Sequence, residues 1–179
     1  LANAVFIINF INRMADHLNT SFKEDLVLEQ IEQIYSMLQP EIEGHIQRWR
    51  VLQDSQQHWQ ENVDLLREFA QKRPSYMRQH MVEYFDLPGT AALSLYTDPG
   101  KGYIKVNSIA VTRETLGVVD PSSWIGEYFM GVPIQVTAGP YPGYQFAGWQ
   151  GLEQDTNGPK ITLTLTENLS VTANFIPMQ

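Results

Sequence analysis

The sequence predicts an α+β protein in two parts, an all-α bundle over residues 1–87 followed by a small all-β module over residues 88–179. Apolar residues recur with a period near 3.6 as far as Asp86, which is typical of helices, and with a period of two after Gly89, which is typical of strands. Between them, Leu87-Pro88-Gly89 combines residues that end helices. This tripeptide is the expected domain boundary.

Five helices are expected in the first part, because prolines and capping residues divide the helical pattern. Ser21 and Glu24 have the spacing of a capping box, in which the Ser21 hydroxyl accepts a hydrogen bond from the Glu24 amide. Pro40 is expected to end or kink the second helix, since proline lacks a backbone N–H. The expected helices begin near Leu1, Ser21, Pro40, Ser55 and Pro74.

The first helix is apolar on most of its circumference, with Phe6, Phe10 and Met14 beside Ile7 and Ile11. Such a helix has to pack against other elements on most sides. We therefore expect the bundle to be the end of a larger domain.

Strands are expected in the second part wherever apolar and polar residues alternate between turn residues. Residues 112–127 show no regular period. Turns are predicted at 98–102, at Pro142-Gly143 and at Asn157-Gly158. The expected strands cover residues 92–96, 103–111, 132–136, 144–149, 161–165 and 171–175.

Composition excludes several classes of protein. The formal net charge is -8, which argues against a broad electrostatic contact with nucleic acid. The chain has no cysteine, and therefore no structural disulfide and no thiolate metal site. No apolar run of 18 residues and no basic segment before an apolar one occur, so we expect neither a membrane span nor a signal peptide. We expect a fragment that begins within a helix.

No catalytic, cofactor-binding or metal-binding residue is predicted. His17, His45, His58 and His80 lack the spacings of metal-binding pairs, and we expect structural or surface roles, with His45 and His80 bonded within the core. The sequence contains no Gly-rich phosphate loop before a helix and no Gly-x-Ser-x-Gly element. The acidic segment 153–158 lacks the alternating ligands of a calcium loop, so a turn is expected there.

Aromatic residues of the second part suggest one surface for interactions. Trp124, Tyr141 and Tyr144 are candidates for an exposed patch, because flat rings near Pro and Gly turns can stack on sugar faces. A flat exposed row of the three would favour glycan binding, and burial of all three would favour a spacer. The core of the small sheet is expected to take Phe146, Trp149 and Phe175.

The helical half resembles the C-terminal end of the CotH family over residues 6–86. That family comprises spore-coat and secreted proteins with an atypical protein-kinase fold. The resemblance is carried by Arg13-Met14-Ala15-Asp16-His17-Leu18-Asn19-Thr20 and by Arg73-Pro74-Ser75-Tyr76-Met77-Arg78-Gln79-His80. It implies that the helices are the tail of a kinase-like C-lobe.

The second half resembles the divergent internalin-type B-repeat over residues 91–176, a β-grasp-like module common in bacterial surface proteins. A single copy is present. The matching elements are Thr137-Ala138-Gly139-Pro140, Gly143-Tyr144-Gln145-Phe146-Ala147-Gly148-Trp149 and Val171-Thr172-Ala173-Asn174-Phe175.

Together the resemblances imply a non-catalytic fragment of a secreted or surface-exposed bacterial protein kinase of the CotH type, with a spore coat as one location. The β module would act as a spacer or protein-docking element, and the partner would be a protein or an upstream part of the same chain. The family's nucleotide-binding lysine and its catalytic and metal-binding aspartates have no counterpart here, so ATP and a divalent metal are expected only for the parent protein. The alternative function is a carbohydrate-binding or adhesion module on a helical scaffold.

Overall fold

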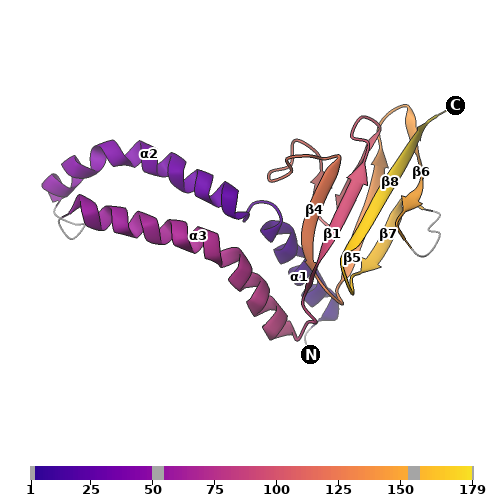
Figure 1. The fold of residues 1–179 in the computed structure, drawn as a ribbon, viewed down its shortest axis with the longest axis horizontal. Coiled ribbons are helices and arrows are strands. Elements are labelled where there is room, and N and C mark those ends of the chain that lie inside the picture. Colours follow the sequence, from indigo (N-terminus) through magenta and orange to yellow (C-terminus); the bar gives the residue numbers. More distant parts are fainter. Residues whose placement is uncertain (1–2, 50–54, 153–157, 179) are drawn as a thin grey trace. The chain divides into compact units, whose positions relative to one another are not determined.

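The computed structural model describes residues 3–49, 55–152 and 158–178, and within them it confirms the α+β class. Residues 153–157 lie outside the described residues. They include most of the acidic segment 153–158 and the first residue of the turn predicted at Asn157-Gly158. Helices precede strands along the chain (Figure 1). The elements are α1 (Ala4–Leu18), α2 (Glu24–Trp49), α3 (Gln56–Phe85), β1 (Thr90–Thr97), β2 (Gly102–Val106), β3 (Ile109–Val111), β4 (Ser123–Phe129), β5 (Pro133–Pro140), β6 (Tyr144–Gln150), β7 (Lys160–Thr164) and β8 (Leu169–Pro177).

The prediction of five helices is wrong, because two of the expected boundaries lie inside continuous helices. Pro40 lies within α2 and Pro74 within α3. A proline removes one backbone hydrogen bond and strains the preceding turn, but the bonds on either side of it remain. In Figure 1 the ribbon of α2 is arched rather than broken.

Helix starts also differ from the predicted capping. Asn3 caps α1, where its Oδ1 accepts from the amides of Val5 at 3.0 Å and Phe6 at 3.4 Å. Ser21 does not begin a capping box, since its hydroxyl is bonded to Nδ1 of His17 at 2.9 Å. The first helical residue of α2 is Glu24, so Ser21 lies too far before the helix to serve its amides.

The strands form two four-stranded sheets, with the orders β4-β1-β8-β6 and β3-β2-β5-β7. β1 and β8, the first and last strands, pair in parallel at the centre of the first sheet, while the other pairs are antiparallel. β4 lies in the segment without a regular period. Its inward residues include Gly126, while Ile125 on its outer face is 59% exposed. Apolar and polar residues therefore do not alternate along β4, and the sequence did not predict this strand.

Both sheets contribute their inward side chains to one hydrophobic core. Buried and exposed residues alternate along the strands, as expected where one face of each sheet is buried. α1 adds Ile11 and Ala15 to this core, and the end of α3 adds Met81. Phe6, on another side of α1, is 67% exposed. Although α1 is apolar on most sides, it is therefore buried along one stripe only.

The chain divides into two compact units, and this division differs from the predicted boundary at Leu87. The first unit contains Leu1–Ser21 and Arg78–Gln179, so that α1 and the end of α3 belong with the strands. The second unit is Phe22–Met77.

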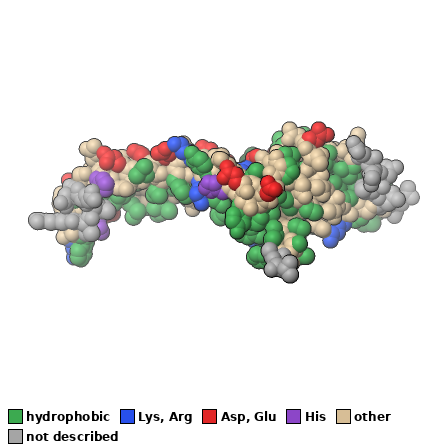
Figure 2. Space-filling view, turned by 90° about the horizontal axis from the view of Figure 1, so that it is seen from below, with side chains coloured by type: hydrophobic (Ala, Val, Ile, Leu, Met, Phe, Trp, Pro, Cys, Tyr) green, Lys and Arg blue, Asp and Glu red, His purple; other side chains and the backbone are tan. Residues whose placement is uncertain are grey.

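The second unit is a hairpin of α2 and the first part of α3. The rings of Tyr35 and Trp59 stack at 5.1 Å, and Arg67 bonds to both carboxylate oxygens of Glu32. In Figure 2 hydrophobic side chains gather along one side of the hairpin and acidic ones along the opposite side. Large apolar side chains that are more than half exposed in this unit are Ile34, Met37, Trp49, Leu65, Leu66 and Phe69.

Candidate functional site

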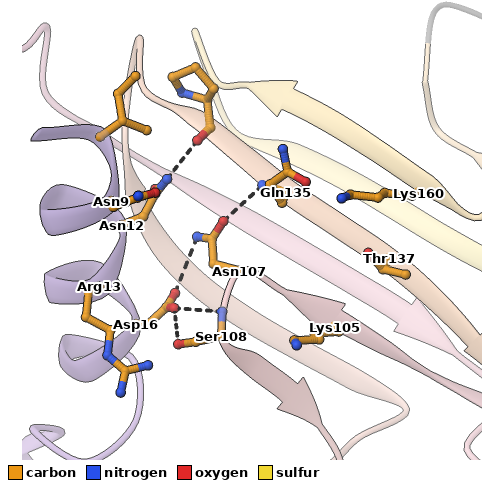
Figure 3. Close-up of a pocket in the computed structure, with 12 residues that line it drawn as sticks. Asn9, Asn12, Arg13, Asp16, Lys105, Asn107, Ser108, Gln135, Thr137 and Lys160 are labelled. Carbon is orange, nitrogen blue, oxygen red and sulfur yellow. Dashed lines mark hydrogen bonds between the residues drawn. The ribbon is translucent and has the colours of Figure 1, made fainter. Parts of the chain in front are cut away.

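A polar cluster fixes α1 to the strands of the first unit, and Asp16 is its centre. The Asp16 carboxylate is 3% exposed. It accepts hydrogen bonds from the amide and hydroxyl of Ser108 and from Nδ2 of Asn107 at 3.4 Å (Figure 3). It also accepts one from the Tyr128 hydroxyl at 3.1 Å. Burial raises the pKa of Asp16, and these hydrogen bonds oppose the rise. The turn between β2 and β3 is thereby attached to the helix.

Asn19 attaches the end of α1 to β4 in the same way. Its amide nitrogen donates to the carbonyl of Glu127, and its oxygen accepts from the amide of Glu127, both at 2.9 Å. The side chain therefore bonds to the backbone of β4 as a neighbouring strand would. Because Asn19 is 4% exposed, both of its polar groups need these partners.

Arg78 completes the cluster from the end of α3. Its Nε lies 2.9 Å from a carboxylate oxygen of Glu127, and its Nη2 donates to the carbonyl of Leu18 and to Oδ1 of Asn19 at 3.3 Å. Arg78 belongs to one of the two sequence motifs of the helical half, and Asn19 to the other. The two motifs meet at Glu127, where Asn19 bonds to the backbone and Arg78 to the side chain.

A hollow of about 530 Å³ lies beside the Asp16 cluster, between α1 and the outer face of the sheet β3-β2-β5-β7. Asn12 on α1 closes one end, where its Nδ2 donates to the carbonyl of Pro133 at 2.8 Å (Figure 3). Lys105, Thr137 and Lys160 line the sheet side. The hollow is therefore lined by both basic and neutral polar side chains.

Family comparisons match both halves of the chain. Residues 1–77 match the family described as CotH kinase protein, and residues 107–179 match the divergent InlB B-repeat domain. The chain is therefore similar to a CotH segment followed by a divergent B-repeat. Comparisons with curated proteins and with solved structures found no match.

The two matched segments meet within the first unit. α1 belongs to the CotH segment, while Ser108, Glu127 and Tyr128 belong to the B-repeat. Residues 78–106 lie outside both matches, yet they include β1, which pairs with β4 and with β8. The B-repeat sheets are therefore completed by strands that precede the matched range, and the polar cluster joins them to a CotH helix.

The three aromatic residues predicted for an exposed patch are not equivalent. Trp124 is 4% exposed and lies in the B-repeat core, so the prediction of its exposure is wrong. Tyr144 is partly buried and packs against the same core. Tyr141 is 36% exposed, with its ring centroid 5.8 Å from that of Tyr103. The predicted row of three exposed rings is not formed.

Two of the four histidines are more exposed than the sequence predicted. His45 and His80 are exposed, so the expectation of bonds within the core is wrong. His58 lies 3.7 Å from Glu61 on the same helix. Among the described residues, no three His, Cys, Asp or Glu side chains are grouped as metal ligands. None of the described helices is long and apolar enough to cross a membrane.

Asp16 and Asn19 belong to the first sequence motif of the helical half, but the sequence alone predicted no structural role for either residue. One signal was present, because both lie beside the buried stripe of Ile11, Ala15 and Leu18 on α1. A polar residue on the apolar stripe of a helix is the informative exception to the pattern. Their partners were not predictable, since Ser108 and Glu127 are more than 90 positions away in the sequence.

Proposed function

We propose that this chain is the non-catalytic end of a secreted or surface-exposed CotH-type kinase. Its helices complete the C-lobe of the kinase fold, and its B-repeat is a docking element held in a fixed position on α1 and the end of α3. The single observation that carries the proposal is the cluster of Asp16, Asn19 and Arg78, which bonds CotH motif residues to the B-repeat.

The buried cluster supports a firmly attached B-repeat rather than a loose spacer. A loose spacer needs no buried polar contacts with the domain it follows, whereas Asp16 and Asn19 are each satisfied by B-repeat groups. Removing any partner would leave a buried polar group without a hydrogen bond, which is costly. The bonds therefore favour one orientation of α1 on the sheets.

The apolar face of α2 and α3 supports a role in completing a larger domain. Leu65 and Phe69 lie one turn apart on α3 and are 61% and 59% exposed, and Ile34 and Leu38 on α2 are similarly exposed. Contiguous apolar surface of this kind is usually covered by a partner. The match of α2, and of α3 as far as Met77, to the CotH family favours the remainder of a CotH kinase fold as that partner.

The absence of phosphate transfer is tested by incubating the chain with labelled ATP, Mg²⁺ or Mn²⁺ and casein as acceptor. We expect no incorporation of phosphate and no saturable ATP binding, because the sequence contains no phosphate loop and no His-Arg-Asp or Asp-Phe-Gly element. Incorporation above that of a protein-free control would contradict the proposal.

Completion of the C-lobe is tested by adding the chain to a CotH kinase core truncated before the matching helices. We expect saturable binding that is lost in the variant Leu65→Glu/Phe69→Glu. Leu116→Glu, which changes an equally exposed leucine of the first unit, is the matched control and should bind as the parent chain does. Equal binding by all three chains would refute a role for the apolar face.

Glycan binding is a second candidate function, favoured by a different observation. Tyr103 and Tyr141 form an aromatic pair at the outer face of β2 and at the end of β5. Such rings can stack on sugar faces. Saturable binding of a saccharide that is weakened by Tyr103→Leu would support this candidate.

A further inference from the structure

A row of polar side chains crosses the outer face of the sheet β3-β2-β5-β7. Lys105 on β2 pairs with Thr137 on β5, and Thr137 pairs with Lys160 on β7. Adjacent strands lie about 4.8 Å apart, so the two lysine backbones are about 10 Å apart. In Figure 3 the nitrogen ends of both lysines point toward α1. The lysines are thus placed to hold one extended ligand together.

The basic residues of this hollow have no described acidic partner. Arg13 lines it from α1, and Lys105 and Lys160 line it from the sheet. None of the three makes an ion pair with a residue in the described ranges, whereas Lys101 is paired with Asp98. Residues 88–179 contain only four basic side chains: Lys101, Lys105, Arg113 and Lys160. Two of these four therefore lie in one row.

Asp16 is the carboxylate that lines the hollow, and it does not neutralise the lysines. Its oxygens already accept from Ser108, Asn107 and Tyr128. Among the described residues that line the hollow, three cations therefore face a single occupied carboxylate, in a chain whose net charge is -8. A local reversal of charge inside a concave surface concentrates anions.

An aromatic surface lies next to the lysine row on the same face. Tyr103 is the outward residue that precedes Lys105 on β2. It is paired with Gly139, and a Cβ added to Gly139 would lie 2.5 Å from the Tyr103 ring, so the ring covers this glycine. Tyr141 lies beside it. Cations and a flat ring on one face suit a ligand that is both charged and cyclic.

We propose that this face binds an acidic saccharide. Lys105 and Lys160 hold carboxylate or sulfate groups, Thr137 and Asn9 bond to hydroxyl groups, and Tyr103 contacts the face of a sugar ring. The inference rests on the glycan-binding candidate function and is independent of the kinase-end proposal.

Titration calorimetry of the full chain tests the proposal with a galacturonic acid pentamer and a heparin tetrasaccharide as probes. We expect saturable binding of at least one of them, which weakens as salt is added because the lysines are exposed. The double variant Lys105→Gln/Lys160→Gln should weaken this binding by at least about tenfold, since two charged hydrogen-bond donors are lost. Tyr103→Leu should weaken saccharide binding and leave binding of inorganic sulfate unchanged.

The matched control is Lys72→Gln/Lys101→Gln, which removes the same charge from two exposed lysines outside the hollow. It should retain the parent affinity to within about twofold. Failure of both acidic probes to bind, or an equal loss in the control, would overturn the proposal. So would equally tight binding of a glutamate hexapeptide. Equal binding of a neutral galactose pentamer would overturn the preference for acidic sugars but leave the glycan-binding candidate standing.

Discussion

At the scale of one residue, the carboxylate of Asp16 attaches α1 to the sheets through hydrogen bonds to Ser108 and Tyr128. Replacing Asp16 by Ala leaves the buried Tyr128 hydroxyl and the partly buried Ser108 amide without their acceptor. We expect the free energy of unfolding of the first unit to fall by about 2–4 kcal/mol, measured by urea denaturation. Glu167→Ala, at an exposed position of the same unit, should change it by less than about 0.5 kcal/mol. A similar small change in Asp16→Ala would contradict the assigned role.

The raised pKa of Asp16 gives a pH dependence with a definite sign. The folded protein binds the Asp16 proton more tightly than the unfolded chain does, so the stability this group contributes is greatest below its ordinary pKa of 3.8 and is lost as pH rises through the raised value. Asp16→Asn has no such group. We expect the stability of the parent chain minus that of Asp16→Asn to fall as pH rises above 3.8. A difference that grows with pH would contradict this cause.

At the scale of elements, a proline inside a helix and a proline in a turn should have opposite effects on stability when replaced by alanine. Pro40→Ala should stabilise the α2–α3 hairpin by about 1–3 kcal/mol, because it restores a helix hydrogen bond and relieves strain. Pro142 precedes Gly143, whose φ is 90°, in a turn closed by the Tyr144 amide and the Tyr141 carbonyl. Pro142→Ala should therefore destabilise by about 0.4–1 kcal/mol. Thermal unfolding followed by circular dichroism measures both, and equal signs would refute this explanation.

The sequence was sufficient where local patterns decide the structure. The α+β class, the change of period near Leu87 and the turn at Pro142-Gly143 follow from the spacing and types of neighbouring residues. It was insufficient where pairing over long separations decides. The parallel pair of β1 and β8 and the strand β4 depend on contacts between distant segments.

The candidate site shows the same limit. Lys105 and Lys160 are 55 positions apart, and only the pairing of both strands with β5 brings them into one row. Trp124 was misjudged because a nearby proline suggested an exposed turn, whereas it lies on the inward face of β4. A residue's face on an irregular strand depends on register, which the sequence of that strand does not specify alone.

The exposed face of the α2–α3 hairpin predicts a property of the whole molecule. The chain alone should associate with itself as its concentration rises, because apolar surface without a partner is buried by self-contact. Leu65→Glu/Phe69→Glu should remain monomeric in sedimentation velocity, while Leu116→Glu should behave as the parent chain. A parent chain that stays monomeric, or association that persists in the double variant, would show that this face does not need covering.

Native-state hydrogen exchange tests most directly the central claim, that a CotH helix is built into the B-repeat unit. The buried amides of α1, such as those of Ile11 and Ala15, should exchange with the same free energy as those of β1 and β8, because they open only when the whole unit unfolds. Asp16→Ala should lower all of these values together. Exchange of the α1 amides at a much lower free energy than the strands, unchanged by Asp16→Ala, would contradict the claim.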